Sequence, residues 1–244
     1  MNGFLSVYLR EILIMKTRFI KMILSMLVAP VLYVIAFGYG IGKNIEINGY
    51  SYLQFLIPGL IAMNSMTQSY NIASEINISR FYWKIFDEYM ASPISNFSYV
   101  LGEVFTGITR ALLGAILIII IGLIAGVKLN YSIYFWLAII LNAFVFSSIA
   151  VFAAMVVKSH ADQAMLSNFI IFPMAFLGGT FFPVKNLPFW AQVIIKSLPI
   201  TFATKAIRGS SLYHKVSITP YIALFITGVS FFIIALYAVN KAKD

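Results

Sequence analysis

Cysteine is absent from this chain of 244 residues, and charged residues make up only 10% of it. The absence of cysteine excludes disulfide bonds, thiolate metal sites and a cysteine nucleophile. The scarcity of charge sets the chain apart from soluble globular domains, in which about a quarter of the residues are charged. With 61% hydrophobic residues and a mean hydropathy of +0.92, the composition is that of an integral membrane protein.

Catalytic and nucleotide-binding motifs are also missing. The nearest approach to a phosphate-binding loop, residues 37–44, has phenylalanine in place of the leading glycine and asparagine in place of the hydroxyl residue. The two histidines, His160 and His214, lie far apart, and no serine stands in a G-x-S-x-G elbow. We therefore expect no catalytic site, no metal and no bound cofactor in this chain.

Long apolar runs define the predicted fold. A bilayer core about 30 Å thick requires about 20 mostly apolar residues in a helix that crosses it. Several stretches meet or approach this length: Met22–Ile41, Tyr52–Ile72, Val100–Ala125, Tyr134–Val157, Ala164–Phe182 and Ile218–Val239. The predicted fold class is an all-α membrane protein with six transmembrane helices, and residues 1–244 are expected to form a single transmembrane domain.

Two segments outside these stretches have their own signatures. Apolar residues recur at helical spacing near the N-terminus, at Phe4, Leu5, Tyr8, Leu9 and Ile12. Residues 1–21 are therefore expected to form an amphipathic helix in the membrane interface. Basic residues ahead of the first apolar run, with no small-residue cleavage site after it, argue against a signal peptide.

The second such segment follows the fifth apolar stretch. Residues 183–200 contain a helix too short to cross the bilayer, and they predict a re-entrant hairpin on the outer face, with an ordinary long loop as the alternative. The residues that mark the interruption and the hairpin are Gly178, Gly179, Phe181, Phe182, Pro183, Pro188 and Trp190.

Basic residues assign the two sides of the membrane. Six spans put both termini on one side, which then carries Arg10, Lys16, Arg18, Lys21, Arg80, Lys84, Lys158, Lys241 and Lys243. The two short loops of the opposite side carry only Lys43 and Lys128. By the positive-inside rule we expect a multi-pass protein of the cell membrane with both termini in the cytoplasm. The outer segment 183–217 weakens this bias, because it contains Lys185, Lys196, Lys205, Arg208 and Lys215.

A short acidic segment, FDEYMASPIS from Phe86 to Ser95, separates the second and third apolar stretches. Residues 80–92 are amphipathic on a helix, with aromatic residues on one arc and charged residues on the other. Pro93 should end this helix at Ser92, and Ser95 can cap the next one. Periodicity alone leaves two interpretations open: a passive interfacial linker, or a surface on which a soluble partner docks.

The wider sequence context bears on this choice. Five motifs occur in order: FLIPGLIAM, EYMASPIS, GEVFTGITRALLGA, FLGGTFFPVKNLPFW and LPITFATKAIRG. In this order and at these spacings the chain, over nearly its whole length, resembles the type-2 ABC exporter permease family, especially its drug-export and nodulation-factor-export branch. The resemblance implies a six-helix membrane subunit without an ATPase of its own. ATP and Mg²⁺ would be bound by a separate nucleotide-binding subunit.

The resemblance also implies partners and site residues. The expected partners are the ATP-binding-cassette subunit, a second copy of the chain or a paralogous permease, and membrane lipid, but no nucleic acid. Helix 80–92 corresponds to the family's coupling helix, which inserts into the ATPase. Asp87 and Glu88 would make polar contacts there, and Phe86, Tyr89 and Met90 an apolar plug. The full set of docking residues is Lys84, Phe86, Asp87, Glu88, Tyr89, Met90, Ser92 and Pro93.

Two charges stand inside the third apolar stretch. Glu103 and Arg110 are seven residues apart and share a helix face, about 10 Å from each other. Such charges usually face a bundle interior or a cavity. One interpretation has them lining or gating a transport pathway. The other has Glu103 near the cytoplasmic boundary and Arg110 paired with another helix.

Together these features predict an exporter subunit for an amphipathic or lipid-linked substrate, such as a drug, a glycolipid or a polysaccharide carrier. The alternatives are a carrier or channel that works without ATP and, disfavoured by the missing catalytic residues, a membrane-embedded enzyme. A carrier usually shows internal repeats and helices broken at the membrane midplane, and neither is clear in this sequence.

Overall fold

The computed structural model of the chain describes residues 3–242, except for the side chain of Met90, and it is almost entirely helical. In chain order the helices are α1 (Gly3–Thr17), α2 (Phe19–Tyr33), α3 (Tyr52–Tyr70), α4 (Ile72–Phe81), α5 (Ile85–Ala91), α6 (Asn96–Ile124), α7 (Ile133–Val156), α8 (His160–Leu166), α9 (Phe172–Leu177), α10 (Phe189–Ser197), α11 (Pro199–Ser211) and α12 (Thr219–Lys241). A π-helical turn over Val34–Ile41 extends α2, and another over Ser167–Ile171 joins α8 to α9. Two short strands, β1 (Glu46–Ile47) and β2 (Tyr50–Ser51), form an antiparallel hairpin.

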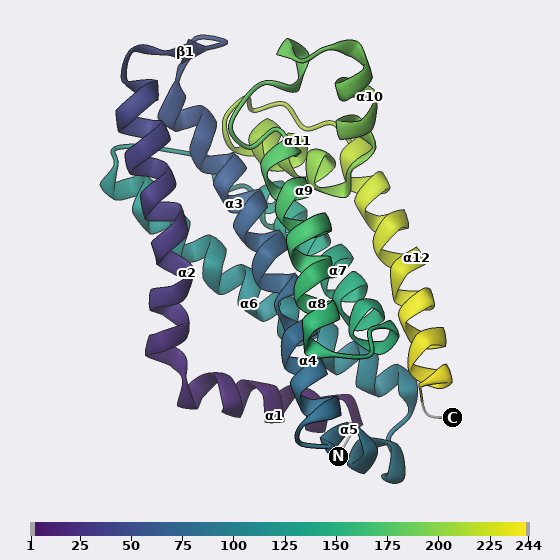
Figure 1. Cartoon of the computed structure of the whole chain (residues 1–244). Coiled ribbons are helices and arrows are strands. Elements are labelled where there is room, and N and C mark those ends of the chain that lie inside the picture. The colour runs from purple at the N-terminus through teal and green to yellow at the C-terminus, as the bar shows by residue number, and fades with distance from the viewer. Residues whose placement is uncertain (1–2, 243–244) are drawn as a thin grey trace.

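The long helices form an elongated bundle with two distinct ends (Figure 1). At one end lie α1, α5 and both ends of the described chain, and we call it the α1 end. At the other lie the β1–β2 hairpin and α10, and we call it the α10 end. α1 lies across the end of the bundle, and the chain turns from it into α2, which runs along the bundle (Figure 1). The helix expected over residues 1–21 is shorter in the structure, because α1 ends at Thr17 and α2 begins at Phe19. Residues 1 and 2 lie outside the described part, and the location of α1 in the membrane interface stays a prediction.

Four of the six expected spans are confirmed as helices long and apolar enough to cross a membrane. They are Phe19–Asn44, Asn96–Ile124, Ile133–Val156 and Thr219–Lys241. The other two expected spans, 52–72 and 164–182, correspond to α3 and to the run from α8 to α9, which are less apolar. α3 can carry polar residues because they are hydrogen-bonded inside the bundle. Asn64 bonds to Gly114 O of α6 and Ser65 accepts from Asn142 of α7, while the Thr67 and Ser69 hydroxyls bond to carbonyls of α3 itself.

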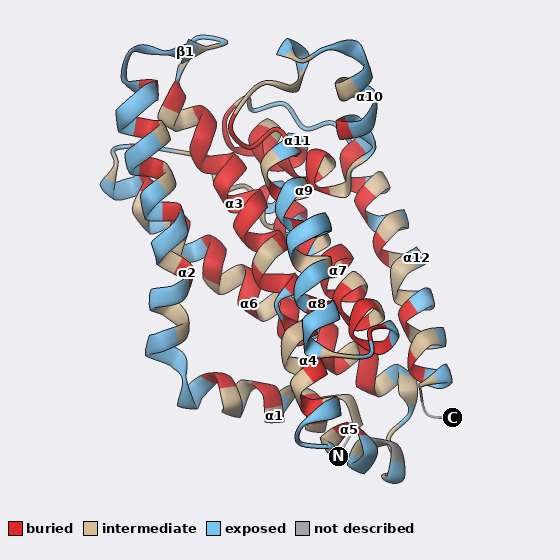
Figure 2. Cartoon of the chain, viewed as in Figure 1, coloured by how far each residue is buried: buried red, intermediate tan, exposed pale blue. Residues whose placement is uncertain are grey.

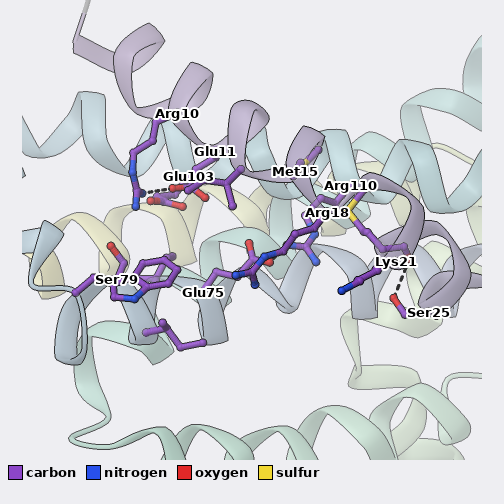
Figure 3. A pocket seen from close by; sticks show the side chains of 15 residues that line it. Arg10, Glu11, Met15, Arg18, Lys21, Ser25, Glu75, Ser79, Glu103 and Arg110 are labelled. Atoms are coloured by element: carbon purple, nitrogen blue, oxygen red, sulfur yellow. Dashed lines mark hydrogen bonds and ion pairs between the residues drawn. The ribbon is translucent and has the colours of Figure 1, made fainter.

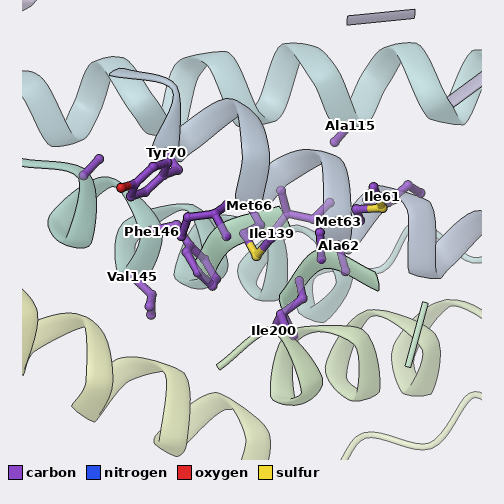
Figure 4. Close-up of a cluster of buried hydrophobic side chains, with 14 of the residues drawn as sticks. Ile61, Ala62, Met63, Met66, Tyr70, Ala115, Ile139, Val145, Phe146 and Ile200 are labelled. Atoms are coloured by element: carbon purple, nitrogen blue, oxygen red, sulfur yellow. The ribbon is translucent and has the colours of Figure 1, made fainter. Parts of the chain in front are cut away.

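α3 is the centre of the bundle. Nearly all of its residues are buried, and it packs against α6, α7 and α11 (Figure 2). Apolar side chains of α3 and α7, including Ile61, Met66, Ile139 and Phe146, interdigitate in the core (Figure 4). Two amides join the helices: Asn142 Nδ2 donates to Ala62 O at 3.1 Å, and Asn64 Nδ2 donates to Gly114 O at 3.1 Å. Because a lipid environment offers no alternative partners, such bonds fix the register between helices.

The region from α4 to α6 corrects one expectation and confirms two. The single helix expected over residues 80–92 is divided, because Lys84 has a left-handed backbone (φ 52°). Arg80 therefore lies in the last turn of α4, which ends at Phe81, and it donates to Ala154 O and Met155 O at the end of α7. α5 ends as expected at Ser92, which is extended before Pro93 (φ −85°, ψ 161°). The Ser95 side chain caps α6 by accepting from Ser98 N.

Gly59 of α3 lies at the closest approach between α3 and the turn after α9. A Cβ atom there would lie 2.7 Å from Thr180 O and 2.9 Å from Thr180 Cα, both of them backbone atoms. Gly40, in contrast, has its nearest neighbour, Ile35 O, at 3.5 Å. The two glycines therefore differ in the space that a methyl group would find.

We expect Gly59→Ala to lower the free energy of unfolding by about 1–3 kcal/mol, because the backbone at Thr180 has to shift. Gly40→Ala, the matched control, should leave stability unchanged or slightly raised. The measurement is the melting temperature of both purified variants in detergent. Equal melting temperatures for the two would contradict the close approach at Gly59.

Candidate functional site

A charged cavity opens at the α1 end, between α1, the start of α2, α4 and α6 (Figure 3). Its volume is about 360 Å³. Its charged lining residues are Arg10, Glu11, Arg18, Lys21, Glu75, Glu103 and Arg110. Apolar side chains, among them Met15, Ile76 and Trp83, line the rest. The cavity therefore offers charges of both signs next to apolar surface, a combination suited to an amphipathic molecule.

Glu103 and Arg110 both reach this cavity but do not contact each other. Arg110 forms an ion pair with Glu75 of α4. Its side chain is 9% exposed, whereas that of Glu75 is 43% exposed. Glu103 is buried and, among the residues that the structure describes, makes no ion pair. Arg110 thus matches the interpretation in which it pairs with another helix, and Glu103 is left as a carboxylate at the cavity wall.

α1 contributes a second buried acid. Val7, Glu11 and Met15 are spaced four residues apart and form its buried face, which packs on α6. A close approach at Gly102, where a Cβ would lie 2.7 Å from Val7 Cβ, brings α1 against α6. Burial raises the pKa of Glu11, and its ion-pair partner Arg10 offsets this only in part. Glu11 and Glu103 therefore line the same cavity, one from α1 and the other from α6.

α5 is attached to α6 by two aromatic rings. Phe86 and Tyr89 each lie with their ring centroids 5.5 Å from that of Tyr99. Phe86 is only 3% exposed, so it anchors α5 within the chain and is not the exposed apolar contact that we expected from the sequence. Burial raises the pKa of Tyr89. The side chain of Met90 lies outside the described residues.

The charged side of α5 remains open. Lys84, Asp87 and Glu88 are exposed, as is Pro93, while Ser92 is half-buried. Among the described residues, Lys84 makes no ion pair with either acid. The exposed surface of α5 is therefore mainly acidic.

Arg10 connects α5 with the charged cavity. Its guanidinium pairs with Glu11 in the cavity and also lies 5.8 Å from the centre of the Tyr89 ring. Arg10 thus contacts groups on both α1 and α5. A movement of α5 against the bundle would act directly on this contact.

The predicted hairpin residues gather at the α10 end. Gly178 packs against Ile200, where a Cβ would lie 2.5 Å from Ile200 Cγ2, and Gly179 has a left-handed backbone (φ 79°). Phe181 is buried, and its carbonyl accepts from Tyr52 Oη at 2.8 Å. Phe182 packs against the core, Pro183 precedes a 3₁₀ turn, and Pro188 precedes α10. Trp190 is 69% exposed.

Glu11 and Glu75 are the site residues that sequence reasoning missed. Glu11 carried a usable signal, because it lies on the same helix face as Val7 and Met15. A charge on an otherwise apolar face indicates a buried site. Glu75 carried no such signal, since its partner Arg110 is distant in sequence and only the packing of α4 near α6 brings the two together.

Comparison with known proteins identifies the family. A family model described as ABC-2 type transporter matches residues 2–212. The chain belongs to the ABC-2 type transporter family. It is 30% identical over 250 residues to the inner membrane transport permease YadH of Escherichia coli K12, covering 98% of this chain and 94% of that protein. It is also 28% identical over 226 residues to nodulation protein J of Rhizobium meliloti, covering 87% of this chain and 85% of the relative.

Family membership confirms the resemblance seen in the sequence. The chain is a membrane subunit of an ABC transporter and a multi-pass protein of the cell membrane. Subunits of this family work together with an ATP-binding subunit. The charged cavity and α5 are therefore the candidate functional features at the α1 end.

The ion pair between Glu75 and Arg110 can be tested by a double-mutant cycle. Glu75→Gln should lower the melting temperature in detergent, because it leaves the buried guanidinium of Arg110 without its carboxylate. Combining it with Arg110→Gln should cost less than the sum of the single changes, with a coupling of about 0.5–3 kcal/mol. Because Glu75 is partly exposed, we expect the lower part of this range.

Two controls accompany the cycle. Asp162→Asn changes an exposed acid on α8 and should leave the melting temperature nearly unchanged. Glu103→Gln removes a buried carboxylate that has no ion pair among the described residues, so it should leave the melting temperature unchanged or raise it. Additive losses for Glu75→Gln and Arg110→Gln would mean that the pair does not stabilise the fold.

Proposed function

We propose that the chain is the permease of an ATP-driven exporter that moves an amphipathic or lipid-linked substrate out across the cell membrane. In this proposal α3 and the run from α8 to α9 also cross the membrane, as the second and fifth of six spans in chain order. The α1 end faces the cytoplasm, and two copies of the chain, or one copy and a paralogous permease, enclose the pathway. ATP and Mg²⁺ are bound by a separate subunit.

The architecture of α5 is the main support for coupling to an ATPase. Phe86 and Tyr89 fasten one side of α5 to α6, while Asp87 and Glu88 are exposed on the other side. A passive linker has no need of such anchoring. A helix that transmits force must be both firmly attached and accessible, and α5 satisfies both requirements.

The charged cavity supports an amphipathic substrate. It lies beside α1 at the predicted cytoplasmic interface, where an amphipathic molecule would enter from the inner leaflet. We assign Glu103 to the pathway, because it faces this cavity without an ion pair among the described residues. Transport by the Glu103→Gln variant tests this role, provided that its melting temperature is unchanged.

Docking of the ATPase is tested by charge reversal on α5. Asp87→Lys with Glu88→Lys should abolish co-purification of the ATPase subunit, since the new charges replace both acids on the exposed side of α5. Folding should be unaffected, because both side chains are exposed. Glu46→Lys, an exposed acid at the α10 end, is the charge-reversal control and should retain the ATPase. Wild-type recovery of the ATPase with the double variant would mean that α5 is only a linker.

The orientation is tested by thiol labelling, because each cysteine introduced into this chain is unique. Asn130→Cys, at the α10 end, should react with an impermeant maleimide in intact cells. His160→Cys, at the exposed start of α8, should react only after the membrane is permeabilised. The opposite pattern would put α5 outside the cell and contradict docking of a cytoplasmic ATPase.

A further inference from the structure

The basic residues of segment 183–217 are unexplained by the proposed topology, since they lie on its outer side. The structure brings most of them together around a second cavity, of about 600 Å³, at the α10 end. Its basic lining residues are Lys185, Lys196, Lys205 and Arg208. Among the described residues that line it, Glu46 is the only acid. The cavity therefore carries a net positive charge of about three, a field that attracts anions.

Arg208 is built into the wall of this cavity. It is only 8% exposed, and its guanidinium lies 3.7 Å from the centre of the Phe55 ring. Nε and Nη2 donate to Phe55 O at 3.2 and 3.1 Å, and Nη2 also donates to Gly179 O at 3.1 Å and Thr180 O at 3.4 Å. Gly59 makes room for this arrangement, since a Cβ there would lie 2.9 Å from Nη2. The guanidinium plane is thus fixed by backbone carbonyls.

The charge of Arg208 is not neutralised by these contacts. Within the part of the chain that the structure describes, Nη1 has no acceptor and Arg208 has no carboxylate partner. Buried charges are normally paired, because the desolvation of an unpaired charge costs on the order of several kcal/mol. A fixed guanidinium with a free donor and no counter-ion indicates that the anion comes from outside the chain.

The remaining positive charges converge on the same place. Thr204, Lys205 and Arg208 share one face of α11 by their spacing, and Lys185 and Lys196 face the cavity from the turn before α10 and from α10 itself. Burial and the nearby charge of Lys196 lower the pKa of Lys205. Three ammonium groups and a guanidinium with a single nearby acid repel one another. A ligand with several anionic oxygens would relieve this repulsion.

The neighbourhood of the cavity indicates that this anion belongs to an amphiphile. α10 leaves an apolar surface exposed, formed by Phe189, Trp190, Val193 and Ile194. Exposed aromatic residues of this kind favour the interface between membrane and water. The cavity therefore lies where the head of a lipid-like molecule meets water, and its arginine and lysines suit phosphate oxygens.

We propose that the cavity between β1, the turn after α9, α10 and α11 binds the phosphate of an amphiphile's headgroup, with Arg208, Lys185 and Lys205 as its ligands. Assignment of the site to the outer leaflet rests on the proposed function and orientation. Binding of the phosphate does not. The source of the phosphate, an amphiphile or the free ion, is distinguished by experiment.

The test is calorimetric titration of the purified protein in non-ionic detergent at fixed ionic strength. The probes are dihexanoyl phosphatidic acid, inorganic phosphate and dihexanoylglycerol, which has the same chains without phosphate. We expect phosphatidic acid to bind about ten-fold more tightly than inorganic phosphate, and dihexanoylglycerol not to saturate the site. Equal affinity for inorganic phosphate would contradict the claim that the ligand is an amphiphile. Absence of phosphatidic acid binding would contradict the claim that the cavity is a phosphate site.

The variants assign binding to this cavity. Lys185→Gln with Lys205→Gln changes two exposed residues and should weaken phosphatidic acid binding about ten-fold. The matched control, Lys43→Gln with Lys128→Gln, removes two exposed charges at the same end that do not line the cavity. It should leave binding within about two-fold of the wild type. Equal losses in both variants would mean non-specific attraction to the surface and would overturn the proposal.

Arg208→Lys tests the guanidinium itself, provided that its melting temperature stays close to that of the wild type. It keeps the charge but loses the planar donor set, so it should also weaken phosphatidic acid binding. Because all titrations use the isolated permease in detergent, their outcome is independent of ATPase docking and of cysteine labelling. Reversed labelling with intact binding would overturn the orientation and leave the anion site standing.

Discussion

The hydrogen bonds that α3 makes inside the bundle are the constraint on which both cavities depend. Asn142 bonds to Ala62 O at 3.1 Å and to Ser65 Oγ at 2.6 Å, while Asn64 bonds to Gly114 O at 3.1 Å. These contacts fix the register of α3 against α6 and α7. The two ends of α3 lead to different cavities: Phe55 accepts from Arg208 near the α10 end, and α4, its continuation, carries Glu75 toward the α1 end. One register therefore sets the geometry at both ends of the bundle.

The two cavities differ in how their buried arginines are compensated. At the α1 end, acids and bases are nearly balanced, and Arg10 and Arg110 each have a carboxylate partner. At the α10 end, Arg208 is held by backbone carbonyls and an aromatic ring, which satisfy its geometry but not its charge. In the first arrangement the buried arginine has a carboxylate of the chain as its partner, whereas in the second it has none and would be neutralised by the proposed external anion.

The sequence predicted local features better than tertiary ones. Pro93 ending α5 at Ser92, and Ser95 capping α6, depend on neighbouring residues, and both predictions were correct. Four spans were predicted from their apolar length alone. α3 is less apolar than those spans and was still predicted as one. Its polar residues are hydrogen-bonded within the bundle, some to α6 and α7 and some to α3 itself. The burial of Phe86 was missed since it depends on Tyr99, which belongs to the next helix.

The candidate sites show the same division. Glu103 and Arg110 were identified because charges within an apolar run are conspicuous in sequence, but their partners were not. The partner of Arg110 is Glu75, thirty-five positions earlier, and Glu11 reaches the same cavity from α1. The excess of basic residues in segment 183–217 was visible as an exception to the positive-inside rule. That these residues meet could not be read from the sequence, because only the fold brings Lys185, Lys205 and Arg208 around one cavity.

Arg10 connects α5 with the interior of the bundle. It pairs with Glu11 and lies over the ring of Tyr89, so it is shared between the charged cavity and α5. Because Phe86 and Tyr89 both pack on Tyr99, α5 cannot shift without moving this aromatic contact against α6. Any such shift changes how well Arg10 compensates the buried carboxylate of Glu11. In a site of low dielectric, a small change in that distance has a large electrostatic effect. The position of α5 and the charge balance of the cavity are therefore physically linked.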